Sequence, residues 1–380
     1  MKIILWVSIA IIFYVYFAYP VIIYLLSLFY KKPLVGKYVY PTVSILVSAY
    51  NEEDNIDKKI QSLRELDYPE ERMEILIGSD GSTDRTNAIA SQYISERLKL
   101  LVKPKREGKP NMLNFLLTQA KGEILVFTDT RQRLDKNALK ELLKYFSDPK
   151  VGSVSSELLY ENEDHDNKTG SGIGLYWKYE KFIRKSESRM GSMLGATGAL
   201  YAIRKELCPA LPRDLILDDV YIPLKIVERG YRAIFDSKAK VYDRVFKDPK
   251  TEFLRKSRTL AGNYQLFFYL HRLFNPLRGK ISWQFFSHKF LRLMVPFLLL
   301  IVLASNAMIV YKGNGSLFYL VLLWAQIGFY VLALLGAWFK TKNKLFDIPN
   351  MFCVMNAAAV VGLFRFVFRQ QDVMWHKAKS

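Results

Sequence analysis

Charge-free apolar residues fill the start of the chain. No charged side chain occurs from Ile3 to Tyr30, and about 20 apolar residues suffice to cross a bilayer. The segment is longer than the core of a signal peptide and lacks a small-residue cleavage site, so we expect an uncleaved transmembrane helix over 1–30. Three further apolar blocks occupy 290–311, 316–339 and 346–368. The pattern predicts an integral membrane protein.

The last apolar block is less regular than the others. It contains Pro349, Asn356 and Arg365, and such interruptions are tolerated at membrane depth where neighbouring protein satisfies the polar groups. We therefore expect about three membrane segments over 290–368, of which the last either crosses the membrane or re-enters it. A short basic tail follows over 369–380.

Strand-like runs alternate with amphipathic runs in the polar middle of the chain. Strands are expected at 42–51, 74–80, 98–102, 123–129 and 151–159. Helices are expected at 51–66, 84–97, 110–120 and 135–146. In the first helix, Ile56, Ile60 and Leu63 fall on one face. Alternating strands and helices indicate βαβ units and a mainly parallel sheet that is covered on both faces.

Three of the expected strands run into carboxylates. The first reaches Glu52, the second Asp80 and the fourth Asp129. A turn alone would explain any one of them, but ligands of open parallel sheets bind beyond the carboxyl ends of the strands. We therefore expect these carboxylates to converge on one crevice, where they could bind a metal, a ribose or a base edge. No Gly-x-Gly-x-x-Gly or Walker sequence follows any strand, which argues against dinucleotide and P-loop enzymes, and the glycines at 170–174 are expected in a loop.

The net charge of +19 is concentrated partly at the ends of apolar segments. Lysines follow the first and third segments at Lys31, Lys32, Lys37, Lys340, Lys342 and Lys344. By the positive-inside rule this places 31–289 in the cytoplasm, on a protein of the inner membrane. No nucleic-acid-binding motif accompanies the charge, so membrane lipids and an anionic substrate are expected as partners and nucleic acid is not. Two cysteines and four scattered histidines give no disulfide frame or zinc site.

Six stretches resemble the membrane-bound family-2 glycosyltransferases, a group that includes cellulose, hyaluronan and poly-N-acetylglucosamine synthases. They are "SAYNEE" (48–53), "GSDGSTD" (78–84), "FTDTRQ" (127–132), "GATGALYAIRKEL" (195–207), "LDDVYIPLKIVERGYR" (217–232) and "RKSRTLAGNYQ" (255–265). The resemblance implies a GT-A fold, that is, a Rossmann-like α/β domain with a mainly parallel sheet, flanked by transmembrane helices. It also implies inverting transfer of a hexosyl or N-acetylhexosaminyl group from a nucleotide sugar, commonly UDP-linked.

The polar middle of the chain is expected to contain two parts. The cytoplasmic GT-A domain would span 31–265. The stretch 266–289 mixes aromatic and basic residues, which is typical of interfacial amphipathic helices, although a plain core helix would show a similar pattern. Such interfacial helices would hold the crevice near lipid.

The resemblance assigns nucleotide contacts at the strand ends. Ala49, Tyr50 and Glu52 would border the nucleoside, and Asp80 would accept a hydrogen bond from the uracil N–H. Lys109 would add to the field around the phosphates. Two alternatives remain open, because Glu52 also suits the first turn of a helix and the loop before Lys109 also suits plain solvation.

Asp129 matches the first residue of the family's Asp-x-Asp metal site. The third position is Arg131 instead of Asp. A single carboxylate still suits Mg²⁺ or Mn²⁺, which can take diphosphate oxygens and water as further ligands. Arg131 would either contact the diphosphate through its fork of donors or form a salt bridge.

Asp218 and Asp219 match the acidic pair that supplies the family's catalytic base, with Asp219 in the base position. Inversion requires a base that deprotonates the acceptor hydroxyl on the face opposite the leaving group. An N-cap role for the pair is the structural alternative. Three small residues would line the donor sugar and the acceptor end, namely Gly195, Thr197 and Gly198.

Arg258 matches the arginine of a Gln-x-x-Arg-Trp motif that clamps the diphosphate. Arg255 replaces the Gln and Thr259 replaces the Trp, which weakens any expectation of processive synthesis. The acceptor would be a lipid-linked or polymer glycan. The alternative function is a non-catalytic nucleotide-sugar scaffold or sensor, and under either reading subunits of an export complex are candidate partners.

Overall fold

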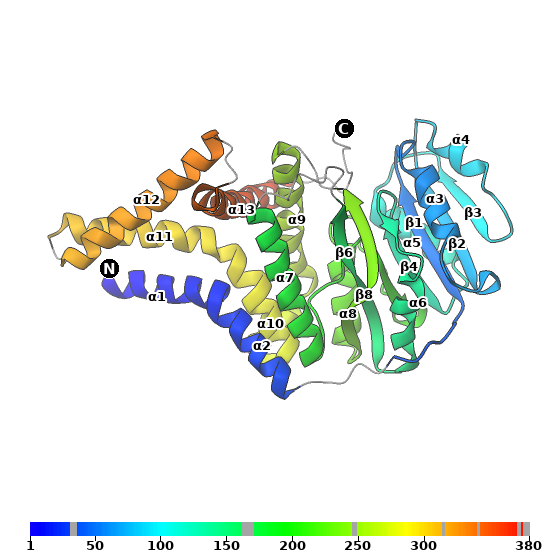
Figure 1. Ribbon diagram of the computed structural model, residues 1–380, viewed down its shortest axis with the longest axis horizontal. Coiled ribbons are helices and arrows are strands. Elements are labelled where there is room, and N and C mark those ends of the chain that lie inside the picture. Colours follow the sequence, from blue (N-terminus) through cyan, green and yellow to red (C-terminus); the bar gives the residue numbers. More distant parts are fainter. Residues whose placement is uncertain are drawn as a thin grey trace. The chain divides into compact units, whose positions relative to one another are not determined.

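The computed structural model describes residues 1–30, 36–161, 171–244, 249–313, 316–339, 343–370 and 374. These residues form two compact units (Figure 1). The α/β unit lies within Tyr30–Glu163 and Glu187–Val245, and the helical unit lies within Met1–Phe29, Asp164–Ser186 and Phe246–Gln370.

The described residues of the α/β unit form an eight-stranded sheet in the order β3-β2-β1-β4-β7-β6-β8-β5. Its strands are β1 Val43–Ala49, β2 Met73–Asp80, β3 Leu98–Lys103, β4 Ile124–Asp129, β5 Arg133–Leu134, β6 Val151–Glu161, β7 Tyr201–Arg204 and β8 Arg232–Arg244. Strands β3, β2, β1 and β4 are parallel, which confirms the expected GT-A type of sheet. β7 pairs antiparallel with both β4 and β6.

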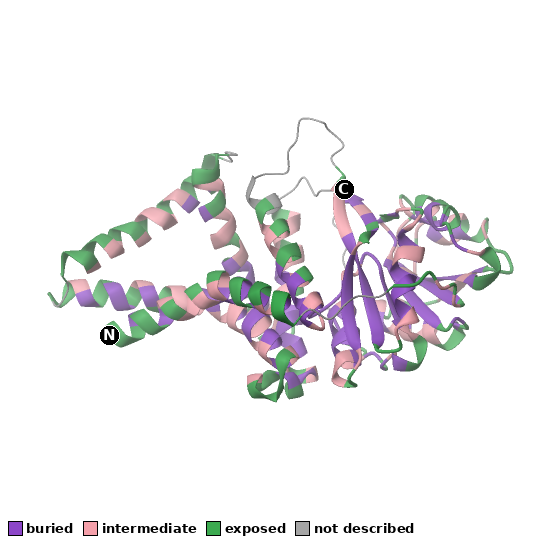
Figure 2. Ribbon diagram, turned by 60° about the horizontal axis from the view of Figure 1, so that its bottom comes forward, coloured by how far each residue is buried: buried purple, intermediate pink, exposed green. Residues whose placement is uncertain are grey.

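Apolar strands that are covered on both faces make the core of this unit. Figure 2 shows the strands of the sheet largely in purple, the colour of buried residues. The helices of the unit are α3 Ile56–Arg64, α4 Thr86–Ser91, α5 Lys109–Gln119, α6 Ala138–Leu143 and α8 Asp218–Glu228. Ile56 and Ile60 of α3 are fully buried in the same cluster as Ile45 of β1. The apolar residues whose spacing predicts this helix therefore point into the core.

Several elements differ from the expectation or were not expected. The predicted loop at 170–174 is wrong for Gly172 and Gly174, because both lie in the helix α7, Ser171–Met190; Gly170 lies outside the described residues. β5, β7 and β8 carry no clear signal of their own in the sequence. The expected domain boundary at 265 falls inside the continuous helix α9, Pro249–Tyr269.

The described residues of the helical unit contain four stretches that are long and apolar enough to cross a membrane. They are Lys2–Phe29, Lys280–Tyr311, Leu317–Phe339 and Lys344–Val367. The first joins α1 Lys2–Phe13 and α2 Tyr19–Phe29 through a π-helical turn, and the second joins α10 Lys280–Gln284 and α11 Leu291–Tyr311 in the same way. The others are α12 Leu317–Phe339 and α13 Lys344–Val367. α13 continues through Pro349 without a break; whether it crosses the membrane or re-enters it stays a prediction.

Close packing of α13 against α9 depends on a glycine. A Cβ atom at Gly362 would lie 2.9 Å from the backbone N of Ala261 and 3.0 Å from the backbone O of Ser257. Gly362→Ala is therefore expected to destabilise the protein by about 1–3 kcal/mol through overpacking. Gly328→Ala in α12 is the matched control, because its Cβ would meet nothing within 4 Å. Thermal unfolding in detergent compares the two, and an equal Tm for both variants would contradict this account of the packing.

Candidate functional site

A lysine joins two of the expected site carboxylates at the carboxyl end of the sheet. Lys109 is the first residue of α5, and its Nζ lies 2.9 Å from Oδ1 of Asp129 and 3.2 Å from Oδ1 of Asp218. Asp129 is the last residue of β4, and Asp218 begins α8. The fold thus brings together three residues that are distant in sequence.

The two acidic residues of α8 have different surroundings. Asp218 is 5% exposed, and the Tyr201 hydroxyl donates to its Oδ2 at 3.2 Å. Asp219 is only partly buried, and its Oδ2 accepts from the backbone N of Gly198 at 3.0 Å. Leu217, not Asp218, occupies the N-cap position, so the capping alternative for the pair does not hold. Asp218 is therefore buried and hydrogen-bonded, whereas Asp219 is partly exposed.

The small residues of the expected sugar-binding loop lie against these carboxylates. A Cβ atom at Gly198 would lie 3.3 Å from Oδ2 of Asp219 and 3.5 Å from Oδ2 of Asp129. Gly195 lies close to Val220 of α8. The backbone N of Thr197 donates to Oγ of Ser155 at 3.0 Å, which ties the loop to β6. The loop at 195–198 therefore lies directly against the carboxylates of Asp219 and Asp129.

Gly198→Ala is expected to lower sugar transfer about tenfold, because small displacements of reacting groups cost up to about 10²-fold. The extra methyl group crowds Asp219 and Asp129 but no core side chain, so the fold should persist. Gly191→Ala is the control, since its Cβ would meet nothing within 4 Å. Turnover and circular dichroism of both variants test the prediction; undiminished transfer in Gly198→Ala would contradict it.

Asp80 accepts hydrogen bonds from the loop that leads to α5. It is 3% exposed, and its two oxygens accept from the backbone N of Glu107 at 2.9 Å and of Gly108 at 2.7 Å. Gly81 has φ +68, and a Cβ there would lie 2.6 Å from the backbone N of Arg106. Asp80 thus holds the loop that leads to α5. The contact of Asp80 with uracil stays a prediction.

Tyr50 lies beside Arg106, a contact that the sequence patterns do not predict. The guanidinium carbon of Arg106 is 3.6 Å from the centre of the Tyr50 ring. Ala49 ends β1 and is 1% exposed, and its place beside a nucleoside stays a prediction. Glu52 accepts from the side-chain N of Asn55 at 2.6 Å, and its backbone N donates to Thr86 Oγ1 at 2.7 Å. These contacts order the loop after β1.

Arg131 forms a bidentate salt bridge with Asp243 of β8. Its Nε and Nη2 donate to the two carboxylate oxygens at 2.9 and 2.5 Å. The Asp243 side chain is 3% exposed and also accepts from Gln132 Nε2 at 3.0 Å. This geometry supports the salt-bridge alternative, and the contact of Arg131 with a diphosphate remains a prediction.

Lys59 is a site neighbour that sequence reasoning missed. It is 1% exposed, and its Nζ donates to Thr128 Oγ1 at 2.6 Å and to the backbone O of Gln132 at 2.9 Å. These two partners flank Asp129. Its position in the sequence could have indicated this burial. Lys59 follows Ile56 by three residues and therefore falls on the apolar face of the expected helix.

Lys59, Lys109 and Asp129 shift one another's pKa values. Burial alone would raise the pKa of Asp129, but Lys109 and then Lys59 outweigh it and hold that pKa below its ordinary value. Burial would lower the pKa of Lys109, but Asp129 and Asp218 raise it overall. Burial lowers the pKa of Lys59 to about 7, against the opposing pull of Asp129 and Asp243. Asp129 is therefore a stable anion and Lys109 a stable cation at neutral pH.

Stability should depend on pH through Lys59. Its pKa falls from 10.5 to about 7 on folding, so between these values the unfolded chain binds more protons than the folded one, and stability rises with pH. Below about pH 7 the contribution is constant. Lys59→Met removes this dependence, so the Tm difference between parent and Lys59→Met should shift in favour of the parent from pH 7 to pH 10. A difference that does not change with pH would contradict the lowered pKa of Lys59 in the folded protein.

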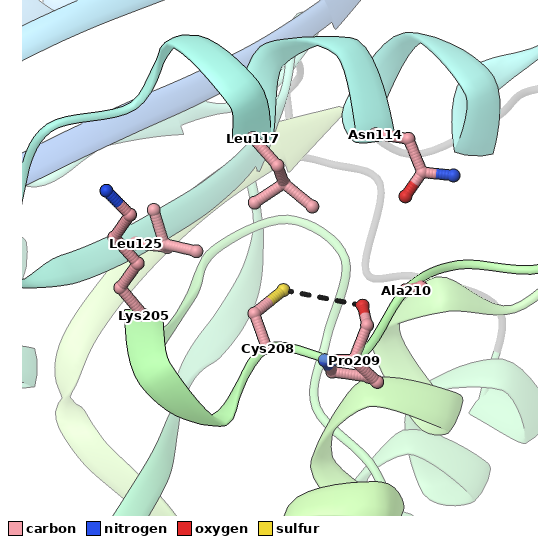
Figure 3. Close-up of a pocket in the computed structure, with 7 residues that line it drawn as sticks. All are labelled: Asn114, Leu117, Leu125, Lys205, Cys208, Pro209 and Ala210. Carbon is pink, nitrogen blue, oxygen red and sulfur yellow. Dashed lines mark hydrogen bonds between the residues drawn. The ribbon is translucent and has the colours of Figure 1, made fainter.

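Arg258 belongs to the helical unit, and a cavity is present in the α/β unit. Arg258 belongs to α9 of the helical unit, so its diphosphate role stays a prediction. A cavity of about 280 Å³ is lined by Leu125, Cys208 and five other residues (Figure 3). Leu125 is near the start of β4, and Asp129 is at the other end of the same strand. Burial raises the pKa of the Cys208 thiol to about 12, which makes it a poor nucleophile at neutral pH.

Comparison with known sequences assigns the domain. The family model described as glycosyl transferase family 2 matches residues 44–211, which include Asp80, Lys109 and Asp129. The chain carries a family-2 glycosyltransferase domain. This confirms the resemblance that the sequence motifs suggested.

Named relatives differ in what they make. The chain is 37% identical over 128 residues to a beta-monoglucosyldiacylglycerol synthase of Synechocystis, covering 33% of this chain and 27% of the relative. It is 25% identical to the probable glycosyltransferase YdaM of Bacillus subtilis, covering 65% of this chain and 61% of the relative. It is also 25% identical to a poly-beta-1,6-N-acetyl-D-glucosamine synthase of Staphylococcus aureus, covering 54% and 50%. The matches thus span between about a quarter and three fifths of these relatives.

A solved structure shares the fold over nearly the whole chain. It is the mannosyltransferase PcManGT from Pyrobaculum calidifontis in complex with GDP-Man and Mn²⁺, with a TM-score of 0.74 and 24% sequence identity. The similarity covers 97% of this chain and 99% of that one. The fold of this chain, including the helices that accompany the sheet, is therefore found in a second protein.

Proposed function

We propose that this protein transfers a sugar from a nucleotide sugar to a membrane-proximal glycan or lipid acceptor, with inversion at the anomeric carbon. The observation that carries the proposal is the cluster of Asp129, Asp218 and Asp219 around Lys109 and Gly198, at the carboxyl edge of a family-2 glycosyltransferase sheet. The resemblance implies a UDP-linked donor. The relatives named above favour a glycolipid or surface polysaccharide as product.

Asp219 is the proposed general base. Its carboxylate is oriented by the backbone N of Gly198, and it is the more accessible member of the acidic pair. It would take the proton of the acceptor hydroxyl as that oxygen attacks the anomeric carbon. The nucleoside diphosphate leaves from the opposite face. Asp218, held by Tyr201 and Lys109, positions the start of α8 for this step.

A divalent ion fits the site through Asp129. The side chain of Asp129 is 41% exposed, and an anionic oxygen ligand of this kind suits Mg²⁺ or Mn²⁺. Among the described residues, no group of three or more His, Cys, Asp or Glu side chains forms a complete cage, so the donor diphosphate would supply further ligands. The ion would neutralise charge on the leaving diphosphate. Lys109 donates to the same carboxylate and would add its charge beside it.

Location and partners follow from the same proposal. The four candidate spans would place the protein in the inner membrane, with 31–289 in the cytoplasm where nucleotide sugars are made available. Within that region, 266–289 would form interfacial helices. An acceptor with a lipid anchor or a growing glycan would enter from the bilayer. Subunits of an export complex are further candidate partners.

A donor screen tests the proposed function. The purified full chain in lipid nanodiscs would be given UDP- and GDP-linked sugars with Mg²⁺ or Mn²⁺, and release of nucleoside diphosphate and the mass of any glycosylated lipid would be measured. We expect one donor class to be consumed only when an acceptor is present. Product length separates single transfer from polymer synthesis. Saturable donor binding without turnover would instead support the scaffold or sensor alternative.

A further inference from the structure

One face of α7 carries lysines together with exposed apolar side chains. Leu175, Lys178, Lys181, Phe182 and Lys185 follow a 3–4 spacing, which places them on one stripe of the helix. All five are exposed, and the exposed fractions of Leu175 and Phe182 are 55% and 41%. A stripe of this composition is unfavourable in water but suits a lipid surface, where apolar groups enter the acyl region and lysines reach the headgroups.

The opposite face of α7 is fixed to the apolar helices of the same unit. The Tyr179 hydroxyl donates to the backbone O of Tyr16 at 2.9 Å. The Glu180 carboxylate forms a salt bridge with Arg292 and lies 3.4 Å from Nε2 of His288. Ile183 is fully buried. α7 is therefore attached to the first two candidate spans.

The contacts also give the depth of α7 along the first candidate span. The rings of Phe182 and Tyr24 lie 5.3 Å apart, and Tyr24 is itself 38% exposed. Tyr24 belongs to the last turns of the span that ends at Phe29. Exposed aromatic side chains near the end of a span are typical of the membrane–water interface. α7 thus lies at the level where headgroups would surround it.

We propose that the stripe of Leu175, Lys178, Lys181, Phe182 and Lys185 binds anionic lipid headgroups of the membrane. The three lysines supply the charge complementarity, and the two apolar side chains supply the insertion. Each lysine near an anionic surface contributes about fivefold to the preference for anionic lipid. The contact anchors α7 at the surface of the bilayer independently of any sugar transfer.

Amide hydrogen exchange of the full chain in nanodiscs tests this site. The discs contain phosphatidylcholine alone or phosphatidylcholine mixed with phosphatidylglycerol. Exchange over 175–185 should be several-fold slower in the mixed discs, and high salt should reduce the difference because it screens exposed charges. The amount of phosphatidylglycerol retained after detergent extraction gives a second readout. Neither readout uses sugar transfer, so failure here leaves the proposed function untouched.

Matched charge variants make the test specific. The variant Lys178→Gln/Lys181→Gln/Lys185→Gln should lose the difference between the two lipids and retain several-fold less phosphatidylglycerol. The control carries the same charge change on three exposed lysines of the α/β unit, as Lys58→Gln/Lys136→Gln/Lys150→Gln, and should behave like the parent. The proposal is overturned if the parent exchanges equally in both lipids, if the α7 variant keeps the difference, or if the control loses it as well.

Discussion

Asp219→Asn is expected to lower the turnover of sugar transfer by about 10²–10⁴-fold, the usual contribution of a general base. The amide keeps the size of the carboxylate and retains an oxygen that can accept from the backbone N of Gly198. The folded structure should therefore be preserved. What is lost is the ability to take the proton from the acceptor hydroxyl. The KM for the donor should change little, because the base acts in the transition state and not on the bound nucleotide.

Steady-state release of nucleoside diphosphate, measured with and without acceptor, checks this result. Asp67→Asn is a suitable control, because Asp67 is an exposed carboxylate in an ion pair with Lys140, and exposed pairs contribute little. Asp218→Asn gives a second comparison. It should reduce stability as well as turnover, since Asp218 is buried and accepts from Tyr201. If Asp219→Asn turned over like the parent, another group would have to serve as base.

The regular part of the fold could be predicted from local patterns. β1, β2, β3 and β4 are short apolar runs between helices whose apolar residues recur every three or four positions, and these signals lie within single windows of the sequence. The rule on strand ends concerned Glu52, Asp80 and Asp129, whereas the acidic pair Asp218 and Asp219 came from the family resemblance. β7 has only four residues, and β8 pairs with β6 and β5 far away in sequence. Such elements are stabilised by tertiary contacts that no local window contains.

The detailed roles of site residues could be predicted only in part, because each depends on a partner distant in sequence. A carboxylate at the end of β2 faces either a ligand or the protein, and only the loop at 107–108 shows that both oxygens of Asp80 accept backbone hydrogen bonds. Lys59 resembles an ordinary helix lysine until Thr128 and Gln132 are placed beside it. The family motif likewise gives no indication that Arg131 meets a residue 112 positions away.

Arg131→Met is expected to destabilise the α/β unit by about 3–5 kcal/mol, the usual cost of leaving a buried charge without its partner. The Asp243 side chain is 3% exposed, and its bidentate contact with Arg131 supplies two charge-assisted hydrogen bonds. Gln132 would remain as a donor, but it is neutral. Asp243→Asn should cost less, because the Arg131 side chain is 26% exposed and water can solvate it.

A double-mutant cycle isolates the pair. The variant Arg131→Met/Asp243→Asn has no unpaired charge at this position, so it should be more stable than the sum of the single changes implies, by about 1.5 kcal/mol or more. Chemical unfolding of the parent and the three variants measures this coupling. Arg97→Met is the control, because Arg97 and Glu70 form an exposed pair with 48% and 77% of their side chains accessible, and little change is expected there. Strict additivity of the two single changes would show that the salt bridge contributes nothing.

The same variants decide between the two roles of Arg131. If Arg131 only pairs with Asp243, then Arg131→Met and Asp243→Asn should alter the KM for the donor to a similar, small extent, because both act through the loop that follows Asp129. If the guanidinium also contacts the diphosphate, Arg131→Met should raise the KM strongly, whereas Asp243→Asn releases the guanidinium and should leave it bound to the donor. The bidentate geometry of the pair leads us to expect the first pattern, and a rise in KM confined to Arg131→Met would refute it.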